Sequence, residues 1–518
     1  MKRILLCLVS VFFVFVVACQ SNKDSSLHRL RINLGSEPQS LDPRKVRDIN
    51  SISLASSLFE GLFRISSTGV PVLGLAEKVE TLENGTKYLF HLRRTYWSDG
   101  KALTAYDFAY SWKAALEPSF GAPFTSFLYV VKNAKQIKEG KLSTSYLGVC
   151  VKDPYTLEVE LEHPVANFFE LLAIPIFFPV PKHIVEKFPS WAENTSHYVC
   201  CGPFFLQKWK HQDSLLLKKN LTYWEASSVR LLEIQCFMVS ASTEYAMFES
   251  QELDWAGSPF STLPIEILQK AKEENLLHIE PFLGTYFVRV NLQSNKCSPS
   301  VRNALYTSID REGLVKHILQ GNQAPAQGLI PPSMRVSEKN ELCSRCIEGL
   351  KESLLQIQQP LTLLYVNEQR SHLVAQSLQE GWKERLHVPI QLEAVERKVF
   401  YDRVSKGQYE LAMGSWIADF NDPMNFLEVF KYKDNGMNQT FWENAEYIDL
   451  LNAAELCKDE NVRSVILQKA HLILMEEKPI LPLYHPTLNY LKRKKVRNVY
   501  VSSLGRIDFK WAYIEEEK

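Results

Sequence analysis

The stretch Tyr409-Glu-Leu-Ala-Met-Gly-Ser-Trp-Ile-Ala-Asp-Phe-Asn-Asp-Pro423 places a carboxylate directly after an apolar, strand-like run. The run ends in Trp416-Ile417-Ala418, and Asp419 follows immediately. Asp422-Pro423 indicates the start of a helix, because Asp is a good N-cap and Pro fits the first helical turn. Since Asp422 can cap that helix, two interpretations of Asp419 remain: it holds a cationic ligand, or it pairs with a neighbouring arginine.

The strand at 409–416 ends a series in which strands and helices alternate. Strands are predicted at 361–365 and 390–395, with helices over 368–386 and 400–406 between them. Such a βαβαβ series implies parallel pairing with right-handed crossovers. Because ligands of parallel sheets lie beyond the carboxyl ends of the strands, Asp419 is expected at a ligand-binding edge.

Further elements are predicted on both sides of residue 286. Strands are expected at 30–34, 204–210, 214–218 and 286–291, with helices over 52–63 and 301–320, the last ended by Gly321. Between residues 64 and 185 the pattern favours hairpins, with Asn84-Gly85 as a two-residue turn signal and a strand with one wet face at 157–162. Thr104 and Asp107 predict the capped start of a helix that Pro118 ends.

The first residues are typical of an export signal. Lys2-Arg3 precede an apolar run from Ile4 to Val17, and Val16-Val17-Ala18-Cys19 matches a lipobox. The pattern resembles bacterial lipoproteins, in which the signal is removed and Cys19 is lipidated; the alternative is an ordinary secretory signal with a coincidental cysteine. We expect the mature protein to be tethered to a bacterial membrane, on the extracytoplasmic side.

Composition excludes some partners. Removal of residues 1–18 takes away Lys2 and Arg3 and no acidic residue, so a net charge of zero becomes about −2. A nucleic-acid partner would favour a basic surface. A chain of 518 residues exceeds what one core usually supports, so several domains are expected.

Catalytic and metal-binding signatures are missing from the sequence. It contains no G-x-S-x-G, H-E-x-x-H, Walker A or G-x-G-x-x-G motif, so we expect neither an enzyme nor a cofactor or metal. Cys343-Ser-Arg-Cys346 has the spacing of a redox pair or half a zinc site, but a loop disulfide or free thiols are favoured because no second half is present.

A set of short phrases in a fixed order resembles one family, the extracytoplasmic solute-binding proteins of peptide ABC importers (family 5), with the oligopeptide binders as the nearest branch. The phrases run from about residue 30 to residue 490: Gly35-Ser-Glu-Pro-Gln-Ser-Leu-Asp-Pro43, Leu58-Phe-Glu-Gly-Leu62, Trp97-Ser-Asp-Gly100, Thr104-Ala-Tyr-Asp-Phe-Ala-Tyr-Ser-Trp112, Cys201-Gly-Pro-Phe204, Val301-Arg-Asn-Ala-Leu-Tyr-Thr-Ser-Ile-Asp-Arg311, Pro331-Pro332 and Trp416-Ile-Ala-Asp-Phe-Asn-Asp-Pro423.

The resemblance implies an α/β, two-lobed periplasmic-binding-protein fold with three domains, mixed β-sheets flanked by helices and a ligand cleft between the lobes. The expected division is a signal peptide at 1–18, a lipidated tether at 19–29, lobe I at 30–63, an additional hairpin-rich domain at 64–185, more of lobe I at 186–285, lobe II at 286–485 and the C-terminal return of lobe I at 486–518.

The resemblance also implies roles for particular residues. Asp419 occupies the position whose carboxylate holds the α-ammonium of the peptide, and Tyr110 matches a ligand-contacting tyrosine, although it can equally fill a core between domains. Main-chain contacts are expected at Ile49 and around Ser415, Trp416 and Ile417. Tyr286 and Tyr484 are expected on strands that face the cleft, and the alternative for each is the core.

The chain departs from the family where the oligopeptide binders use a tryptophan and two arginines for side-chain stacking and the peptide's C-terminus. Those positions hold Arg397, Val404 and Met413. Arg397, Lys398, Arg403 or Lys406 can supply a replacement cation, or each is a solvated surface charge.

The function expected is therefore that of a monomeric, membrane-tethered protein that binds a short peptide and hands it to an ABC permease. Alternatives are a cell-wall peptide, metal chelate or haem as the ligand, or a surface lipoprotein that acts as a receptor or adhesin.

Overall fold

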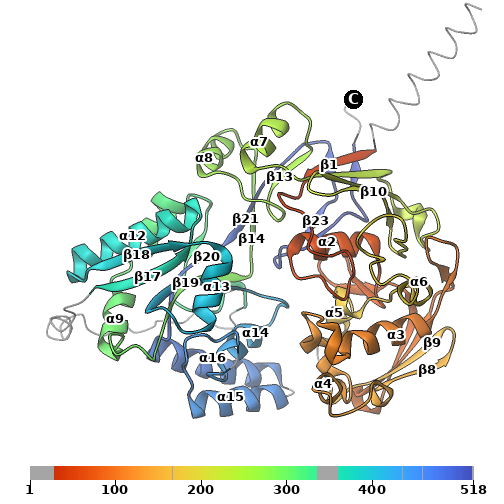
Figure 1. The fold of residues 1–518 in the computed structure, drawn as a ribbon, viewed down its shortest axis with the longest axis horizontal. Helices are drawn as coiled ribbons and strands as arrows, with labels where there is room; N and C mark the ends of the chain where they lie inside the picture. The colour runs from red at the N-terminus through yellow and green to blue at the C-terminus, as the bar shows by residue number, and fades with distance from the viewer. Residues whose placement is uncertain (1–27, 166, 335–359, 435, 458, 516–518) are drawn as a thin grey trace, which may run out of the picture. The chain divides into compact units, whose positions relative to one another are not determined.

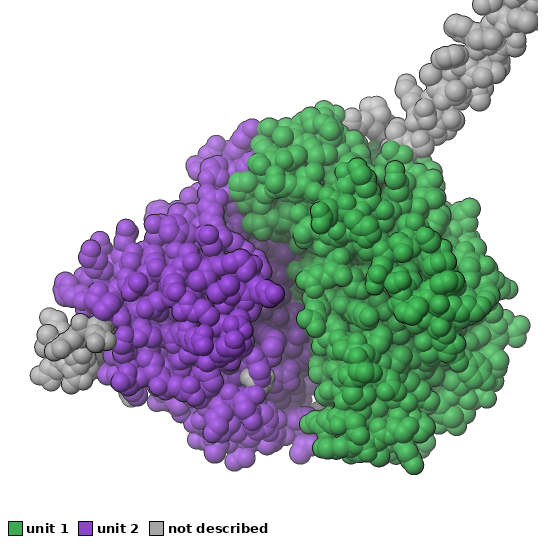
Figure 2. All heavy atoms as spheres, viewed as in Figure 1, with its two compact units in different colours: residues 1–264, 274–278, 489–518 green, residues 265–273, 279–488 purple. Residues whose placement is uncertain are grey.

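The computed structural model describes residues 28–165, 167–334, 360–434, 436–457 and 459–515. The chain forms two compact units, each made from separate stretches of sequence. Unit 1 takes residues from 1–264, 274–278 and 489–518, and unit 2 takes 265–273 and 279–488 (Figure 2). The predictions at Cys19, Cys343 and Cys346 fall outside the described residues, as do the signal peptide and nearly all of the tether.

A seven-stranded mixed sheet lies mainly in unit 1. β1 runs parallel to β12 and β13, whereas β10, β11 and β12 pair antiparallel. The order across the sheet is β10 (Phe204–Lys210), β11 (Ser214–Lys219), β12 (Glu233–Phe237), β1 (Arg29–Asn33), β13 (Trp255–Gly257), β21 (Thr487–Lys492) and β14 (Leu277–Pro281) (Figure 1). The strands predicted at 30–34, 204–210 and 214–218 are confirmed, to within one residue at each end.

Unit 1 also contains an antiparallel four-stranded sheet in the region predicted to be rich in hairpins. Its order is β4 (Ala76–Leu82), β5 (Lys87–Leu92), β9 (Thr156–Glu160) and β8 (Val149–Asp153). The predicted two-residue turn is wrong, because Leu82 pairs with Lys87 and the loop holds the four residues between them. The helix capped by Thr104 and Asp107 is confirmed as α3 (Ala105–Leu116), with the full capping box.

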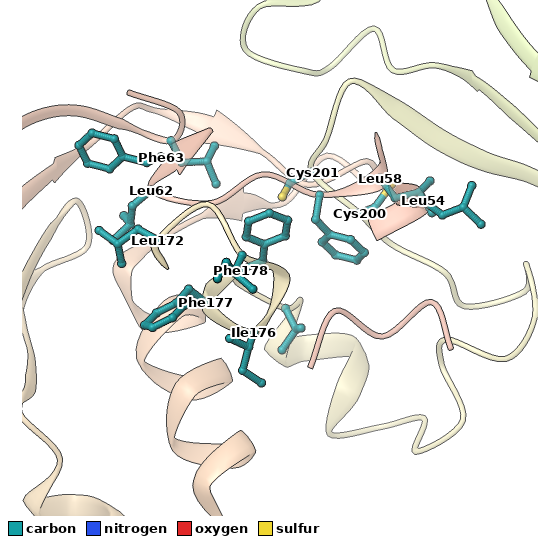
Figure 3. Packing of buried hydrophobic residues seen from close by; sticks show 14 of the residues in the cluster. Leu54, Leu58, Leu62, Phe63, Leu172, Ile176, Phe177, Phe178, Cys200 and Cys201 are labelled. Atoms are coloured by element: carbon teal, nitrogen blue, oxygen red, sulfur yellow. The ribbon is translucent and has the colours of Figure 1, made fainter. Parts of the chain in front are cut away.

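One hydrophobic cluster joins both sheets of unit 1. Leu58, at the end of α2 (Ile49–Leu58), packs in it with Phe178 and Cys201 (Figure 3). Gly202 lets two segments approach closely here, since a Cβ on it would lie 2.5 Å from the carbonyl carbon of Leu58. The helix predicted over 52–63 is thus shorter than expected, because the chain turns to extended backbone at Phe59.

Unit 2 is built on a six-stranded mixed sheet. Its order is β16 (Ala324–Pro325), β20 (Ile480–His485), β15 (Gly284–Val290), β19 (Leu411–Ile417), β17 (Leu361–Val366) and β18 (Ile390–Val395). β18, β17 and β19 are parallel, as the βαβαβ series predicted. The strand predicted at 286–291 is β15, which runs antiparallel to β19 and β20.

Helices cover both faces of this sheet. α9 (Pro299–Thr307) and α12 (Gln369–Leu386) bury Leu305 and Trp382 against one face. α13 (Arg397–Ser405) buries Phe400 and Val404 against the other. The α/β class and the mixed sheets flanked by helices are confirmed.

The helix predicted over 301–320 is broken in the structure. α9 ends at Thr307, and a new turn starts where Asp310 accepts a hydrogen bond from the Gly313 N–H. A π-helical turn follows over Leu314–Leu319, and Gln320, not Gly321, ends it with a positive φ of 57°. The cause is Asp310, whose short carboxylate favours capping over helix continuation.

The C-terminal part of unit 2 is helical. It contains α14 (Met424–Leu427), α15 (Ala445–Leu456) and α16 (Glu460–Glu477). Two further helices are α7 (Ala241–Glu249) in unit 1 and α8 (Ile265–Glu273) in unit 2. In the part of the chain that the structure describes, none of the helices has the length and apolar character needed to cross a membrane.

Candidate functional site

Several residues that the sequence singled out meet in one row across the sheet of unit 2. Tyr286 of β15 has Ser415 of β19 as its register partner on one side and Tyr484 of β20 on the other. The two tyrosine rings stack with their centroids 4.8 Å apart. Tyr484 is buried in the core, and Tyr286 is half-buried. Burial raises the pKa of both hydroxyls, so they are neutral hydrogen-bonding groups at neutral pH.

Charged groups surround Tyr286. Burial is the largest cause of the raised pKa of Tyr286. Of the nearby charges, Arg370 and Arg397 act to lower this pKa, whereas Glu368 and the Tyr401 hydroxyl act to raise it. Arg397 is exposed at the start of α13 and donates a hydrogen bond to Glu368. The charge of Arg397 therefore already has an anionic partner within unit 2.

Two of the other cations that the sequence offered as replacements are also paired. Arg403 forms a bidentate ion pair with Glu393, with donor–acceptor distances of 2.5 and 3.0 Å. Lys406 donates to Asp402 at 2.8 Å, one turn away on α13. Lys398 is exposed on the same helix. The ion pairs of Arg403 and Lys406 are surface pairs, which contribute little to stability, and they reduce the positive charge available to a ligand.

The two family positions expected to carry arginine are filled by core residues. Val404 is 0% exposed and packs with Phe400 and Leu364, and Met413 is 8% exposed in the main cluster of unit 2. An apolar side chain at each position is therefore explained by packing.

The turn after β19 is fixed by a residue that the sequence did not reveal. Asn425 is buried, and its Oδ1 accepts hydrogen bonds from the indole Nε1 of Trp416 and from the backbone N–H of Asp419, both at 3.0 Å. The only sign of this role in the sequence is that a polar asparagine stands inside the otherwise apolar run Met424–Leu427. This pair of bonds ties the strand end to α14 and sets the direction of the Asp419 backbone.

Pro423 occupies the N-cap position of α14, so the predicted capping by Asp422 comes from one residue earlier in the chain. The Asp422 Oδ1 accepts from the backbone N–H of Met424 at 2.7 Å, at the start of α14. The same carboxylate pairs with Arg463 at 2.8 and 3.1 Å. Capping and charge balance at the helix start are thus supplied by Asp422.

Acidic groups gather near this turn. The pKa of Glu428 is raised to about 7, first by burial and then by the negative charges of Asp419, Glu455 and Asp422, while Lys431 opposes the shift. Asp419 therefore contributes a negative potential strong enough to affect a second carboxylate. A cation is the ligand that such a potential favours.

The edge of β19 just before Asp419 is open. β15 pairs with all seven residues of β19, whereas β17 pairs only with Leu411 and Ala412. β17 runs on for two residues to Val366, beside Met413 and Gly414, so among the described residues the side of β19 away from β15 has no strand beside it only from Ser415 to Ile417. Backbone groups on such an edge can pair with an added strand.

The remaining predicted site residues lie in unit 1. Ile49 is the first residue of α2, which Asp48 caps through a hydrogen bond to Ser51. Tyr110 is half-buried on α3, with the Lys182 Nζ 5.7 Å from its ring centre. Burial raises the pKa of Tyr110.

The described residues form neither a disulfide nor a metal site. Six cysteines are free thiols there, and four of these, Cys200, Cys201, Cys236 and Cys297, are buried. No group of three or more His, Cys, Asp or Glu side chains is placed to hold a metal within those ranges.

Comparison with known proteins gives consistent matches along the chain. The model of the bacterial extracellular solute-binding proteins, family 5 (middle) matches residues 70–438. The oligopeptide-binding protein OppA of Bacillus subtilis is 35% identical over 536 residues, which cover 98% of each chain.

Solved structures of similar fold cover nearly the whole chain. The oligopeptide-binding protein OppAIV of Borrelia burgdorferi has a TM-score of 0.83 at 27% identity and covers 94% of this chain and 99% of its own. Haemophilus influenzae OppA, solved in complex with RPPGFSPFR, has a TM-score of 0.82 at 26% identity with the same coverage. These are binding proteins and not enzymes, which agrees with the missing catalytic motifs. The chain belongs to the bacterial extracellular solute-binding proteins of family 5.

Proposed function

We propose that this protein is the substrate-binding component of a peptide ABC importer. It holds a short peptide by its free N-terminus and its backbone and delivers it to a membrane permease. The peptide-binding relatives support this ligand class, and the Haemophilus influenzae protein was solved with a nine-residue sequence, RPPGFSPFR. The lobe boundaries and the ligand cleft expected between the lobes stay predictions.

The observation that carries the proposal is the open edge of β19 beside the carboxylate of Asp419. A peptide in extended conformation can pair its backbone with residues 415–417, as in β-strand addition, without a requirement for particular side chains. Its α-ammonium then meets Asp419, which follows two residues after the strand ends. Asn425 holds the backbone of Asp419 in place through the hydrogen bond to its N–H, which supports a fixed position for the carboxylate.

Ile49 at the start of α2 and Tyr110 on α3, both in unit 1, keep their predicted roles as ligand contacts. Tyr286 and Ser415 lie in the same row of unit 2, where they contact the peptide near the strand end. Arg397 adds a positive charge at the start of α13, weakened by its pairing with Glu368.

The test is the affinity for peptides with and without a free amino group, measured by isothermal titration calorimetry. Acetylation of the N-terminus should weaken binding to the wild-type protein by about 30- to 5,000-fold, which corresponds to the ~2–5 kcal/mol expected for truncation of a buried charged contact. Asp419→Asn should bind both forms equally weakly. Asp402→Asn, which removes a charge from an exposed position on α13, is the control and should keep the preference. Equal binding of both peptides by the wild-type protein would refute the role of Asp419.

The lipid tether and the ligand's identity need separate measurements. Mass spectrometry of the membrane-bound protein should find an acylated Cys19 as the first residue, and Cys19→Ala should release the protein from membranes. Native mass spectrometry of the purified protein should show a co-purified short peptide; a chelate, a haem or a cell-wall fragment in its place would support the alternative ligands. A protein that carries no ligand, and whose melting temperature no peptide raises, would support a receptor or adhesin.

A further inference from the structure

The first described residues lie at one edge of the seven-stranded sheet of unit 1. β1, β12 and β13 run parallel, so their first residues share that edge, and β11 and β21 end there because they run antiparallel to β12 and β13. The carbonyl of His28 accepts a hydrogen bond from the backbone N–H of Leu232, just before β12, at 2.9 Å. We call this side of the sheet the entry edge; it consists of residues 28–29, 218–221, 230–233, 254–255 and 492–495.

Basic side chains outnumber acidic ones at the entry edge. Its ranges hold eight Lys or Arg residues and two acidic residues, although the mature chain as a whole is slightly acidic. Glu233 is shared by two cations, Arg29 at 2.5 Å and Lys218 at 3.5 Å. Asp254, which is buried, is also shared by two cations. The two carboxylates therefore do not neutralise the positive charge.

Three of the basic residues have no carboxylate within 4.0 Å among the described residues. They are Lys219 at the end of β11, Arg230 before β12 and Lys494 after β21. Arg230 and Lys494 are exposed, and Lys219 is half-buried. The guanidinium of Arg230 lies 3.5 Å from the ring centre of Tyr513, which fixes its position without removing its charge.

Two exposed leucines stand among these cations. Leu221, two residues after Lys219, is 81% exposed, and Leu232 is 41% exposed. An exposed leucine alone needs no explanation. Basic and apolar side chains together, however, are the composition of protein surfaces that lie in the headgroup region of a membrane.

The proposed lipid tether brings the entry edge to a membrane. Residues 20–27 are all that separates Cys19 from His28, and nine residue steps span at most about 30 Å even when fully extended. The entry edge therefore stays within that distance of the headgroups while the anchor is inserted. The carboxyl ends of the parallel strands, where β1 continues towards Ile49, lie at the opposite edge of the sheet and are left free.

We propose that the entry edge of unit 1 docks on the anionic phospholipid headgroups of the membrane that carries the lipid anchor. The proposal rests on the lipid tether of the proposed function. Phosphate oxygens accept hydrogen bonds from guanidinium and ammonium groups, and each basic residue near an anionic membrane improves its partition by about fivefold. The three unpaired cations should together give a gain on the order of a hundredfold.

The test measures vesicle binding without the lipid anchor. The mature chain with Cys19→Ala is co-sedimented with vesicles of phosphatidylcholine, or of phosphatidylcholine and phosphatidylglycerol in equal parts. It should bind the anionic vesicles at least tenfold more tightly than the neutral ones at about 0.1 M salt, and the preference should disappear at about 1 M salt, where the Debye length falls from about 10 Å to about 3 Å.

Charge variants assign the binding to the entry edge. Combined replacement of Lys219, Arg230 and Lys494 by Gln should reduce the preference for anionic vesicles to within about threefold of none. The control neutralises three exposed lysines of unit 1 outside the seven-stranded sheet and should keep the full preference; these are Lys101, Lys135 and Lys187.

An apolar variant tests the leucine independently of charge. Leu221→Ser should weaken binding to anionic vesicles by about three- to tenfold, with an unchanged melting temperature because the side chain is 81% exposed. Melting curves accompany every variant, and if the triple variant does not fold, Lys494→Gln and Leu221→Ser carry the comparison.

Three results would overturn the proposal: equal binding to neutral and anionic vesicles, a triple variant that keeps the anionic preference, or a dimer in solution that Leu221→Ser dissolves, which would assign this face to a second copy of the chain. Acylation of Cys19 is measured separately by mass spectrometry. An acylated protein whose lipid-free form ignores anionic vesicles keeps the tether and loses the docking surface. A protein without acylation that still prefers anionic vesicles loses the tether and keeps the membrane contact.

Discussion

Replacement of Asn425 by alanine should weaken unit 2 and the proposed ammonium site together. The side chain of Asn425 is 1% exposed, and its single oxygen accepts from the Trp416 indole and the Asp419 backbone. Alanine removes the acceptor for both donors. The strand end and α14 then lose the connection that fixes the direction of Asp419.

The expected magnitude follows from these two bonds. Each hydrogen bond contributes about 0.5–1.5 kcal/mol net, so the free energy of unfolding of unit 2 should fall by about 1–3 kcal/mol. Trp416 and Asp419 are only half-buried, so water can partly replace the lost acceptor and the upper end is not exceeded. For binding, a less ordered Asp419 should cost about 1 kcal/mol, or roughly a fivefold loss of affinity for a free N-terminus.

Urea titration and calorimetry with a free and an acetylated peptide measure the two effects. Asn438→Ala is the matched control: Asn438 is also buried in unit 2, and its Nδ2 donates to the carbonyls of Tyr432 and Trp442. Both variants should lose stability, but only Asn425→Ala should reduce the preference for a free N-terminus. In an Asp419→Asn background the binding effect of Asn425→Ala should disappear, because the two residues act on one contact.

An Asn425→Ala variant with unchanged unfolding free energy would refute the two hydrogen bonds. A variant that is less stable but keeps the full preference for a free N-terminus would show that Asn425 supports the fold without orienting Asp419.

Three further predictions follow from burial and charge. Because the pKa of Glu428 is raised to about 7 in the folded protein, its protonated form adds stability that is complete below about pH 4.5 and is lost as the pH rises through 7. Glu428→Gln should therefore flatten the dependence of the melting temperature on pH between pH 5 and 7.5; an unchanged pH profile would contradict the shift. Iodoacetamide at pH 8 should label the exposed Cys150 quickly. Burial raises the pKa of Cys200 to about 12 and should protect Cys200 and Cys201 from labelling until the protein unfolds; peptide mapping measures both results. Val404→Arg should lower the unfolding free energy by about 3 kcal/mol or more, because the position is 0% exposed against Phe400 and Leu364; near wild-type stability in urea would show that the position can still accept the arginine of the oligopeptide binders.

Local patterns predicted much of unit 2. The strands and helices from 361 to 417 and the cap at Asp422 arise from periodicity and from residue preferences that act over a few positions, so one sequence suffices to find them. The prediction of one helix over 301–320 was wrong because the Asp310 side chain accepts a hydrogen bond from the backbone and so competes with helix continuation. Such a competition depends on a small energy difference.

The residues that the sequence did not reveal act over long separations. The entry edge of unit 1 combines residues as far apart in the chain as Arg29 and Lys494, and no short stretch of sequence shows that they share one edge of a sheet. The pairing of Arg397 with Glu368 spans 29 residues and depends on the parallel neighbours β17 and β18. Contacts of this kind follow from the sheet order, which a single sequence does not determine.

The departures at Val404 and Met413 acquire a physical meaning from this arrangement. Both positions are packed into cores of unit 2, so an arginine at either would have to leave the core or disrupt it. The absence of arginine at both positions is therefore accounted for by the packing of unit 2.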